Sequence, residues 1–160
     1  MNFSSPVSES SSPISITFDV GYYTNSEIAL ITSENQGIYV FDGASVTLAS
    51  TGVINNGIIE TLNGFTFVGN GSTLNISRPI DPTHPEYSYD FIGTGSSTRS
   101  FSSKIVGIKA TMSGLYIFTE DSIEYMGSNA LQNVAGSATF ISSPIGKSSA
   151  PINNNCIAAA

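Results

Sequence analysis

The sequence predicts an all-β protein made of antiparallel hairpin repeats that pack like the blades of a propeller. Its composition supports this, because the 160 residues include 27 Ser and 14 Thr, with 19 Ile and 8 Val against 6 Leu. Branched and hydroxyl-bearing side chains pack well on a pleated sheet but lose rotamer freedom on a helix. A repeated hairpin pattern and strands that are apolar on both faces add to the prediction, and the length suits one ordinary domain.

The chain begins with a Ser- and Pro-rich stretch over residues 1–13, which is expected to form an extended N-terminal arm without a core of its own. Residues 14–160 are then expected to form the hairpin-repeat domain. Within it, alternating apolar and hydroxyl residues predict a half-buried strand over residues 14–18, and a second strand is predicted over residues 27–32.

A pattern of one glycine, four strand-forming residues, a short polar turn and a serine occurs three times, starting at Gly37, Gly64 and Gly114. The three polar turns fall at residues 42–44, 69–71 and 119–121. Turn residues of this kind tolerate or require positive φ, and the apolar runs beside them can pair as strands. Each copy therefore predicts a β-hairpin.

The first arm of two hairpins, at residues 38–41 and 115–118, is apolar at both alternating positions. Such a strand is expected to be covered on both faces, as in stacked propeller blades; an ordinary sandwich with apolar central strands is the alternative. A blade takes about 40–50 residues and a closed propeller needs about four or more blades. The chain therefore predicts a partial propeller, either a fragment of a longer polypeptide or a protomer that completes its sheet with other chains.

The middle of the chain is expected to be less regular. Two prolines flank the one histidine, His84, in residues 81–89, and because proline disfavours helical backbone before it, an extended surface loop is predicted. A flexible polar connection over residues 93–100 follows, and a strand resumes over residues 104–109.

The charge balance excludes two classes of function. Five Lys and Arg residues stand against 12 Asp and Glu, a formal net charge of -7. A specific nucleic-acid binder needs cations to neutralise phosphates, and a peripheral membrane protein needs a basic face or a long apolar anchor. The N-terminus lacks the pattern of a secretory signal and Cys156 is the sole cysteine, so assembly in a reducing cytoplasm is expected.

The residues that could carry chemistry do not form a recognised constellation, so no catalytic, cofactor-binding or metal-binding residues are predicted. A metal site needs three or four ligands, whereas His84 and Cys156 are far apart in the sequence. A serine triad around His84 lacks the Gly-x-Ser-x-Gly turn, and Gly146-Lys147-Ser148 lacks the first glycine of a phosphate-binding loop.

The densest acidic cluster consists of Glu120, Asp121 and Glu124. Paired carboxylates can cleave glycosides or bind a hard cation, which keeps an enzyme among the hypotheses. Their position at the tip of the third predicted hairpin favours a solvated turn instead.

Several segments resemble one known family. They are residues 107–108, 114–125 and 145–150, together with residues 63–79, 81–85 and 104–108 upstream. In this order they resemble the propeller segment of the packaged-DNA stabilization proteins, the tail hub or tail accessory proteins of short-tailed bacteriophages. The resemblance covers residues 36–155, and its most distinctive parts are the Ile-Glu-Tyr strand at residues 123–125 and the His-Pro loop. Members of that family are longer and close a full propeller.

The resemblance implies a virion protein in the neck or tail, assembled in the host cytoplasm. It would form a homo-oligomeric ring below the portal or adaptor ring, help retain packaged DNA, and dock a tail needle, fibre or spike proteins. The alternative is a β-rich phage fibre or adhesin-type module that binds glycans, for which Tyr22, Tyr23, Tyr87 and Tyr89 are the candidate aromatic rings.

Overall fold

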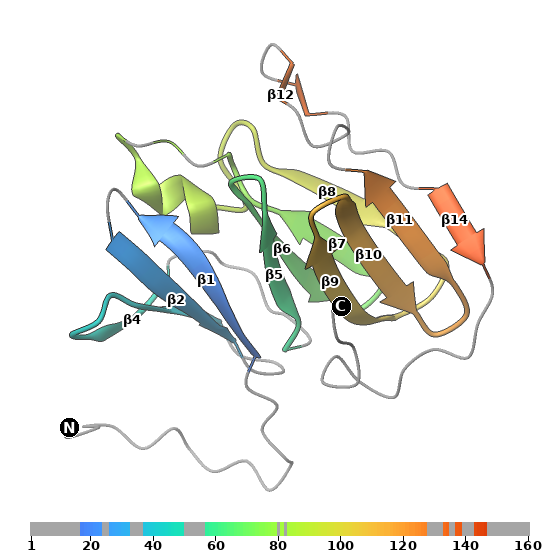
Figure 1. Cartoon of the computed structure of the whole chain (residues 1–160), viewed down its shortest axis with the longest axis horizontal. Coiled ribbons are helices and arrows are strands. Elements are labelled where there is room, and N and C mark those ends of the chain that lie inside the picture. The colour runs from blue at the N-terminus through green and yellow to red at the C-terminus, as the bar shows by residue number, and fades with distance from the viewer. Residues whose placement is uncertain are drawn as a thin grey trace, which may run out of the picture.

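A computed structural model describes residues 17–23, 26–32, 37–49, 57–79, 81, 83–127, 133–134, 137–138 and 143–146. These residues form three four-stranded antiparallel sheets, one two-stranded hairpin and one short 3-10 helix, which confirms the all-β prediction (Figure 1). The predicted arm at residues 1–13 lies outside the described residues. In the described part of the chain, no helix has the length and apolar character needed to cross a membrane.

The sheets follow one another along the chain. The first contains β1 (Thr17–Tyr23), β2 (Ser26–Thr32), β3 (Ile38–Phe41) and β4 (Val46–Leu48) in that order. The second contains β5 (Ile59–Leu62), β6 (Phe65–Asn70), β7 (Thr73–Ile76) and β8 (Ser97–Ser100). The third contains β9 (Ile105–Thr111), β10 (Gly114–Thr119), β11 (Ile123–Gly127) and β14 (Ser143–Gly146). The small hairpin of β12 (Asn133–Val134) and β13 (Ser137–Ala138) precedes β14.

The strand predicted over residues 27–32 is confirmed as β2, which begins one residue earlier. Of the strand predicted over residues 14–18, residues 14–16 lie outside the described residues, and residues 17–18 begin β1, which continues beyond the predicted end to Tyr23. Its pairing with β2 runs without interruption from Thr17 opposite Thr32 to Tyr23 opposite Ser26. The alternation of apolar and polar residues continues through Val20 and Tyr22, so the sequence pattern extends beyond the predicted end at residue 18.

All three predicted hairpins form, as β3–β4, β6–β7 and β10–β11. In the second, the turn lies later than predicted: Asn70 still pairs with Thr73, and Gly71 has a φ of 57°. The glycines that start the copies have different local roles. Gly64, with a φ of 77°, follows Asn63 in the turn between β5 and β6, whereas a Cβ on Gly114 would collide with the carbonyl oxygen of Met126.

The three hairpins do not occupy equivalent places. The first supplies the third and fourth strands of its sheet, whereas the other two supply the second and third strands of theirs. The sequence pattern therefore marks hairpins in general and does not give the boundaries of a structural repeat.

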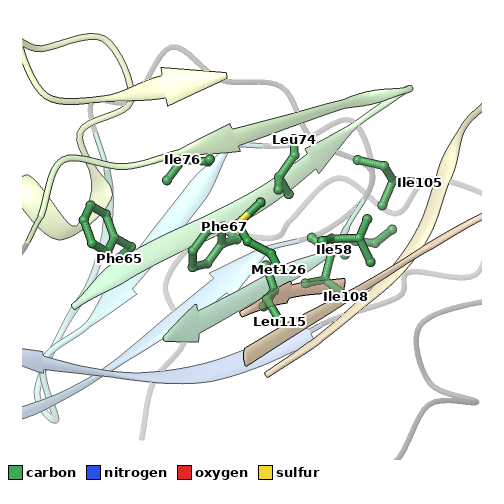
Figure 2. Close-up of a cluster of buried hydrophobic side chains, with 10 residues drawn as sticks. Ile58, Phe65, Phe67, Leu74, Ile76, Ile105, Ile108, Leu115 and Met126 are labelled. Carbon is green, nitrogen blue, oxygen red and sulfur yellow. The ribbon is translucent and has the colours of Figure 1, made fainter. Parts of the chain in front are cut away.

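The second sheet lies between the other two, and its two faces belong to separate cores. The core shared with the first sheet contains Ile28, Leu30, Ile38, Val40, Ala49, Ile59, Val68 and Phe91. The core shared with the third sheet, most of which Figure 2 labels, contains Ile58, Phe65, Phe67, Leu74, Ile76, Ile105, Ile108, Leu115, Ile117 and Met126. Neighbouring residues of β6 point to opposite sides, and both Phe67 and Val68 are 0% exposed. This strand is covered on both faces.

The prediction that residues 38–41 and 115–118 are covered on both faces is only half right. In β3 and β10, alternate residues face the second sheet and are buried, whereas Tyr39, Phe41, Tyr116 and Phe118 are half-buried. The physical reason is position, because the first and third sheets are the ends of the stack and each packs on the second sheet with one face.

The first strands of the three sheets lie together. β5 contacts β1 on one side and β9 on the other, as Figure 1 shows near the middle of the molecule. Sheets that meet along their first strands and stack face to face have the arrangement of propeller blades. The described residues form three such sheets in an open stack, which is a propeller-like but unclosed architecture.

Candidate functional site

The loop that carries His84 and the polar connection after it are more regular than predicted. The prediction of a flexible connection over residues 93–100 was wrong for residues 97–100, because they form β8 and pair with β7. Residues Pro85–Tyr89 form the 3-10 helix η1, with a proline in its first turn, where the missing N–H costs little. The imidazole of His84 stacks on Tyr87, with ring centroids 4.7 Å apart, and Nδ1 lies 3.1 Å from Oε1 of Glu86. The guanidinium of Arg78 lies 3.2 Å from the centroid of the same tyrosine ring. His84 thus takes part in a stacked loop structure.

Asp90 holds the end of this loop in place. Its Oδ1 accepts hydrogen bonds from the backbone N–H groups of Ile92 and Gly93, each at 3.0 Å, and Oδ2 lies 3.4 Å from Nη1 of Arg78. Burial raises the pKa of Asp90, but the two N–H groups and Arg78 outweigh it, so the pKa lies below its usual value. The neighbouring Phe91 is buried in the core between the first and second sheets.

We expect Asp90→Asn to lower the free energy of unfolding at pH 7 by about 1–3 kcal/mol, because charge-assisted hydrogen bonds are lost. A lowered folded-state pKa stabilises the protein above the unfolded-state value of about 3.9 and loses that effect as the pH falls through the folded-state value. The difference between wild type and variant should therefore shrink below about pH 4. Urea denaturation at several pH values measures this difference in the free energy of unfolding, and Glu86→Gln, at an exposed side chain, is the control. An effect that does not change with pH would contradict the role of the charge.

The acidic cluster does not gather into a site. Glu120 and Asp121 are exposed in the turn between β10 and β11, whereas Glu124 lies in β11 opposite Ile117. Asp121 accepts hydrogen bonds from the hydroxyl groups of Ser103 and Thr119, so it stabilises the turn. Among the residues that the structure describes, no three His, Cys, Asp or Glu side chains are placed to hold a metal ion together.

The other candidates are scattered. Gly146 ends β14, whereas Lys147, Ser148 and Cys156 lie outside the described residues. Of the candidate aromatic rings, Tyr22 and Tyr23 fall in β1. Tyr87 stacks within the loop and Tyr89 packs against the core between the first and second sheets.

One partly buried ion pair joins two sheets. The ammonium of Lys109 in β9 lies 3.1 Å and 3.3 Å from the carboxylate oxygens of Glu60 in β5, and the N–H of Ala110 donates to Oε1 at 2.9 Å. The Glu60 side chain is 9% exposed and the Lys109 side chain 34%. This pair fixes the first strands of the second and third sheets to each other. Its one sequence signal is a carboxylate within the apolar run that starts at Ile58.

The outward faces of the first and third sheets carry apolar side chains that are incompletely covered, and on the third sheet Lys109 lies on the same side, opposite Tyr116. We define the first end face by Ile31, Tyr39, Phe41, Val46 and Leu48, and the second end face by Tyr116, Phe118, Ile123 and Tyr125. Residues of each set are cross-strand partners on one side of their sheet, and Val46 and Leu48 are 48% and 63% exposed.

In the second end face the rings of Tyr116 and Tyr125 lie 4.9 Å apart. Contiguous apolar and aromatic surface of this kind is typical of protein–protein contacts.

No protein-family model matches the chain, and no curated protein sequence matches it.

Proposed function

We propose that the chain is a structural protein of a short-tailed bacteriophage virion, located in the head-to-tail connector or tail hub. There it helps retain packaged DNA and docks tail components, without an enzymatic role. The observation that carries the proposal is the pairing of β10 with β11 inside a propeller-like stack. The Ile123-Glu124-Tyr125 strand, which with the His-Pro loop is the most distinctive part of the resemblance, forms one hairpin with the strand that ends in Phe118-Thr119.

The electrostatics support a protein that lets DNA pass. The net charge is -7, and two of the few cations, Arg78 and Lys109, are held by Asp90 and Glu60. A surface with excess carboxylates gives no affinity from counterion release, so DNA would not adhere. Assembly would instead come from contacts with the portal or adaptor ring, a tail needle, fibre or spike proteins, and further copies of the chain in a homo-oligomeric ring.

The proposal is tested on particles of the phage that encodes the chain. We expect the chain to co-purify with DNA-filled particles through a density gradient in several copies per particle, alongside the major capsid protein as the positive control. Particles from a phage with a nonsense mutation in this gene should package DNA and then lose it. Recovery of the chain only as free protein in the lysate, with stable particles in its absence, would refute the proposal.

A glycan-binding fibre or adhesin module is the second candidate, but the described residues support it less. A sugar platform needs an open aromatic face, whereas the ring of Tyr87 already contacts Arg78 and His84. Binding on a glycan array that is lost in Tyr87→Ala would favour this alternative.

A further inference from the structure

Phe91 comes from the loop that joins β7 to β8 in the second sheet, yet its side chain lies in the core that this sheet shares with the first sheet. We propose that this loop is a latch. It holds the first sheet on the second, and when it opens, the first sheet separates while the second and third sheets stay joined. We define the latch by Arg78, Asp90, Phe91 and Gly93. The inference depends on the fold alone and goes beyond the proposed virion role, which concerns neighbouring proteins.

Phe91 is a large part of the core between the first and second sheets. It is 5% exposed, and among the described residues that are buried in this core it is the one with an aromatic side chain. The same core contains Leu30 and Ile38 of the first sheet and Val68 of the second, and Tyr89 of the loop packs against it. Removal of the phenylalanine ring would therefore leave a cavity between the two sheets.

The base of the loop fixes the position of Phe91. The backbone N–H of Arg78, two residues after β7, donates to the carbonyl oxygen of Asp90 at 2.9 Å, so the loop closes on the end of its own sheet. The carboxylate of Asp90 accepts from the N–H groups of Ile92 and Gly93. A Cβ on Gly93 would collide with that carboxylate and would lie 2.7 Å from Cδ of Arg78. The residues on both sides of Phe91 are therefore held by the second sheet, which presents the ring to the first sheet from a fixed base.

The third sheet is joined to the second by contacts of other residues. Their shared core lies on the opposite face of the second sheet from Phe91, and the ion pair between β5 and β9 adds to it. In addition, the N–H groups of Phe101 and Ile105 donate to the carbonyl oxygens of Ser72 and Gly71 in the turn between β6 and β7, each at 2.9 Å. Proteins open locally in cooperative units, and these contacts can keep the second and third sheets together as one unit when the latch opens.

A urea titration followed by methyl NMR measures the unfolding of each sheet separately. In the wild type, Leu30 and Val40 of the first sheet should lose their native signals at lower urea than Leu115 and Ile117 of the third. Phe91→Ala should lower the midpoint of the first sheet by about 1 M or more. The midpoint of the third sheet should not change, because the contact of Phe91 is already lost when that sheet unfolds. Phe91→Leu should shift the first-sheet midpoint less, and it supplies the same readout if the alanine variant does not fold.

Three further variants separate the latch from the rest of the fold. Gly93→Ala should lower the first-sheet midpoint in the same way, because the added Cβ displaces Asp90 from its place beside Phe91. Ile92→Ala, at a neighbouring side chain that is 78% exposed, should leave both midpoints unchanged. Leu115→Ala is the matched truncation in the other core and should lower the midpoint of the third sheet.

One midpoint shared by the methyl groups of all three sheets, in the wild type and in Phe91→Ala, would overturn the proposal, because the chain would then unfold as a single unit. A first-sheet midpoint that Phe91→Ala does not change would overturn it as well, since the loop would then not hold that sheet. None of these results bears on whether the chain co-purifies with phage particles, so the two proposals can fail separately.

Discussion

Replacing Phe67 with alanine is expected to lower the free energy of unfolding by about 3–5 kcal/mol. The ring is 0% exposed in the core between the second and third sheets, where Figure 2 shows it near Met126 and Leu115. Alanine would leave a cavity, and β6 cannot move to close it because it is paired with β5 on one side and β7 on the other. Domains of ordinary size are stable by about 5–15 kcal/mol, so this substitution removes a large share of the total stability.

Chemical denaturation of Phe67→Ala and Phe67→Leu measures this effect, and the leucine variant should fall between alanine and wild type. Ile92→Ala is the matched control, because its side chain is 78% exposed and its loss should change stability by less than about 0.5 kcal/mol. Equal stability of Phe67→Ala and Ile92→Ala would mean that the second and third sheets do not share a core.

Replacing Lys109 with methionine is expected to cost about 1–3 kcal/mol of unfolding free energy, because it removes the ammonium that lies 3.1 Å from the mostly buried carboxylate of Glu60, although the lysine itself is partly solvated. Lys104→Met is the matched control, since Lys104 is exposed and precedes the same strand, so its substitution should have little effect.

A double-mutant cycle with Glu60→Gln isolates the pairing. Glutamine removes the buried charge and keeps an acceptor for the N–H of Ala110, so Glu60→Gln combined with Lys109→Met should be more stable than Lys109→Met alone. Additive effects of the two substitutions would show that the ion pair does not couple β5 to β9.

The features that depend on short stretches of sequence were predictable. Strand β2 and the three hairpins follow from apolar runs of a few residues and from the turn residues between them, such as Asp42 and Gly71. Both signals act within about ten residues, where side-chain alternation and turn preferences determine the conformation.

The features that depend on packing between distant segments were not predictable. Lys109 and Glu60 are 49 positions apart, and no local pattern connects them. The offset between the first hairpin and the other two, and the half-buried outer faces of β3 and β10, follow from the position of each sheet in the stack. The acidic residues of the third hairpin form a cluster in the sequence but not in the structure. Asp121 stabilises the turn, whereas Glu124 lies in the paired strand β11.

The position of the second sheet between the other two is tested most directly by nuclear Overhauser effects between methyl groups in a sample labelled at Ile, Leu and Val. We expect contacts from Val68 to methyl groups of the first sheet, such as those of Leu30 and Val40, and from Leu74 to those of Leu115 or Ile117 in the third. Methyl contacts confined within each sheet would contradict the stack, and with it the propeller-like architecture.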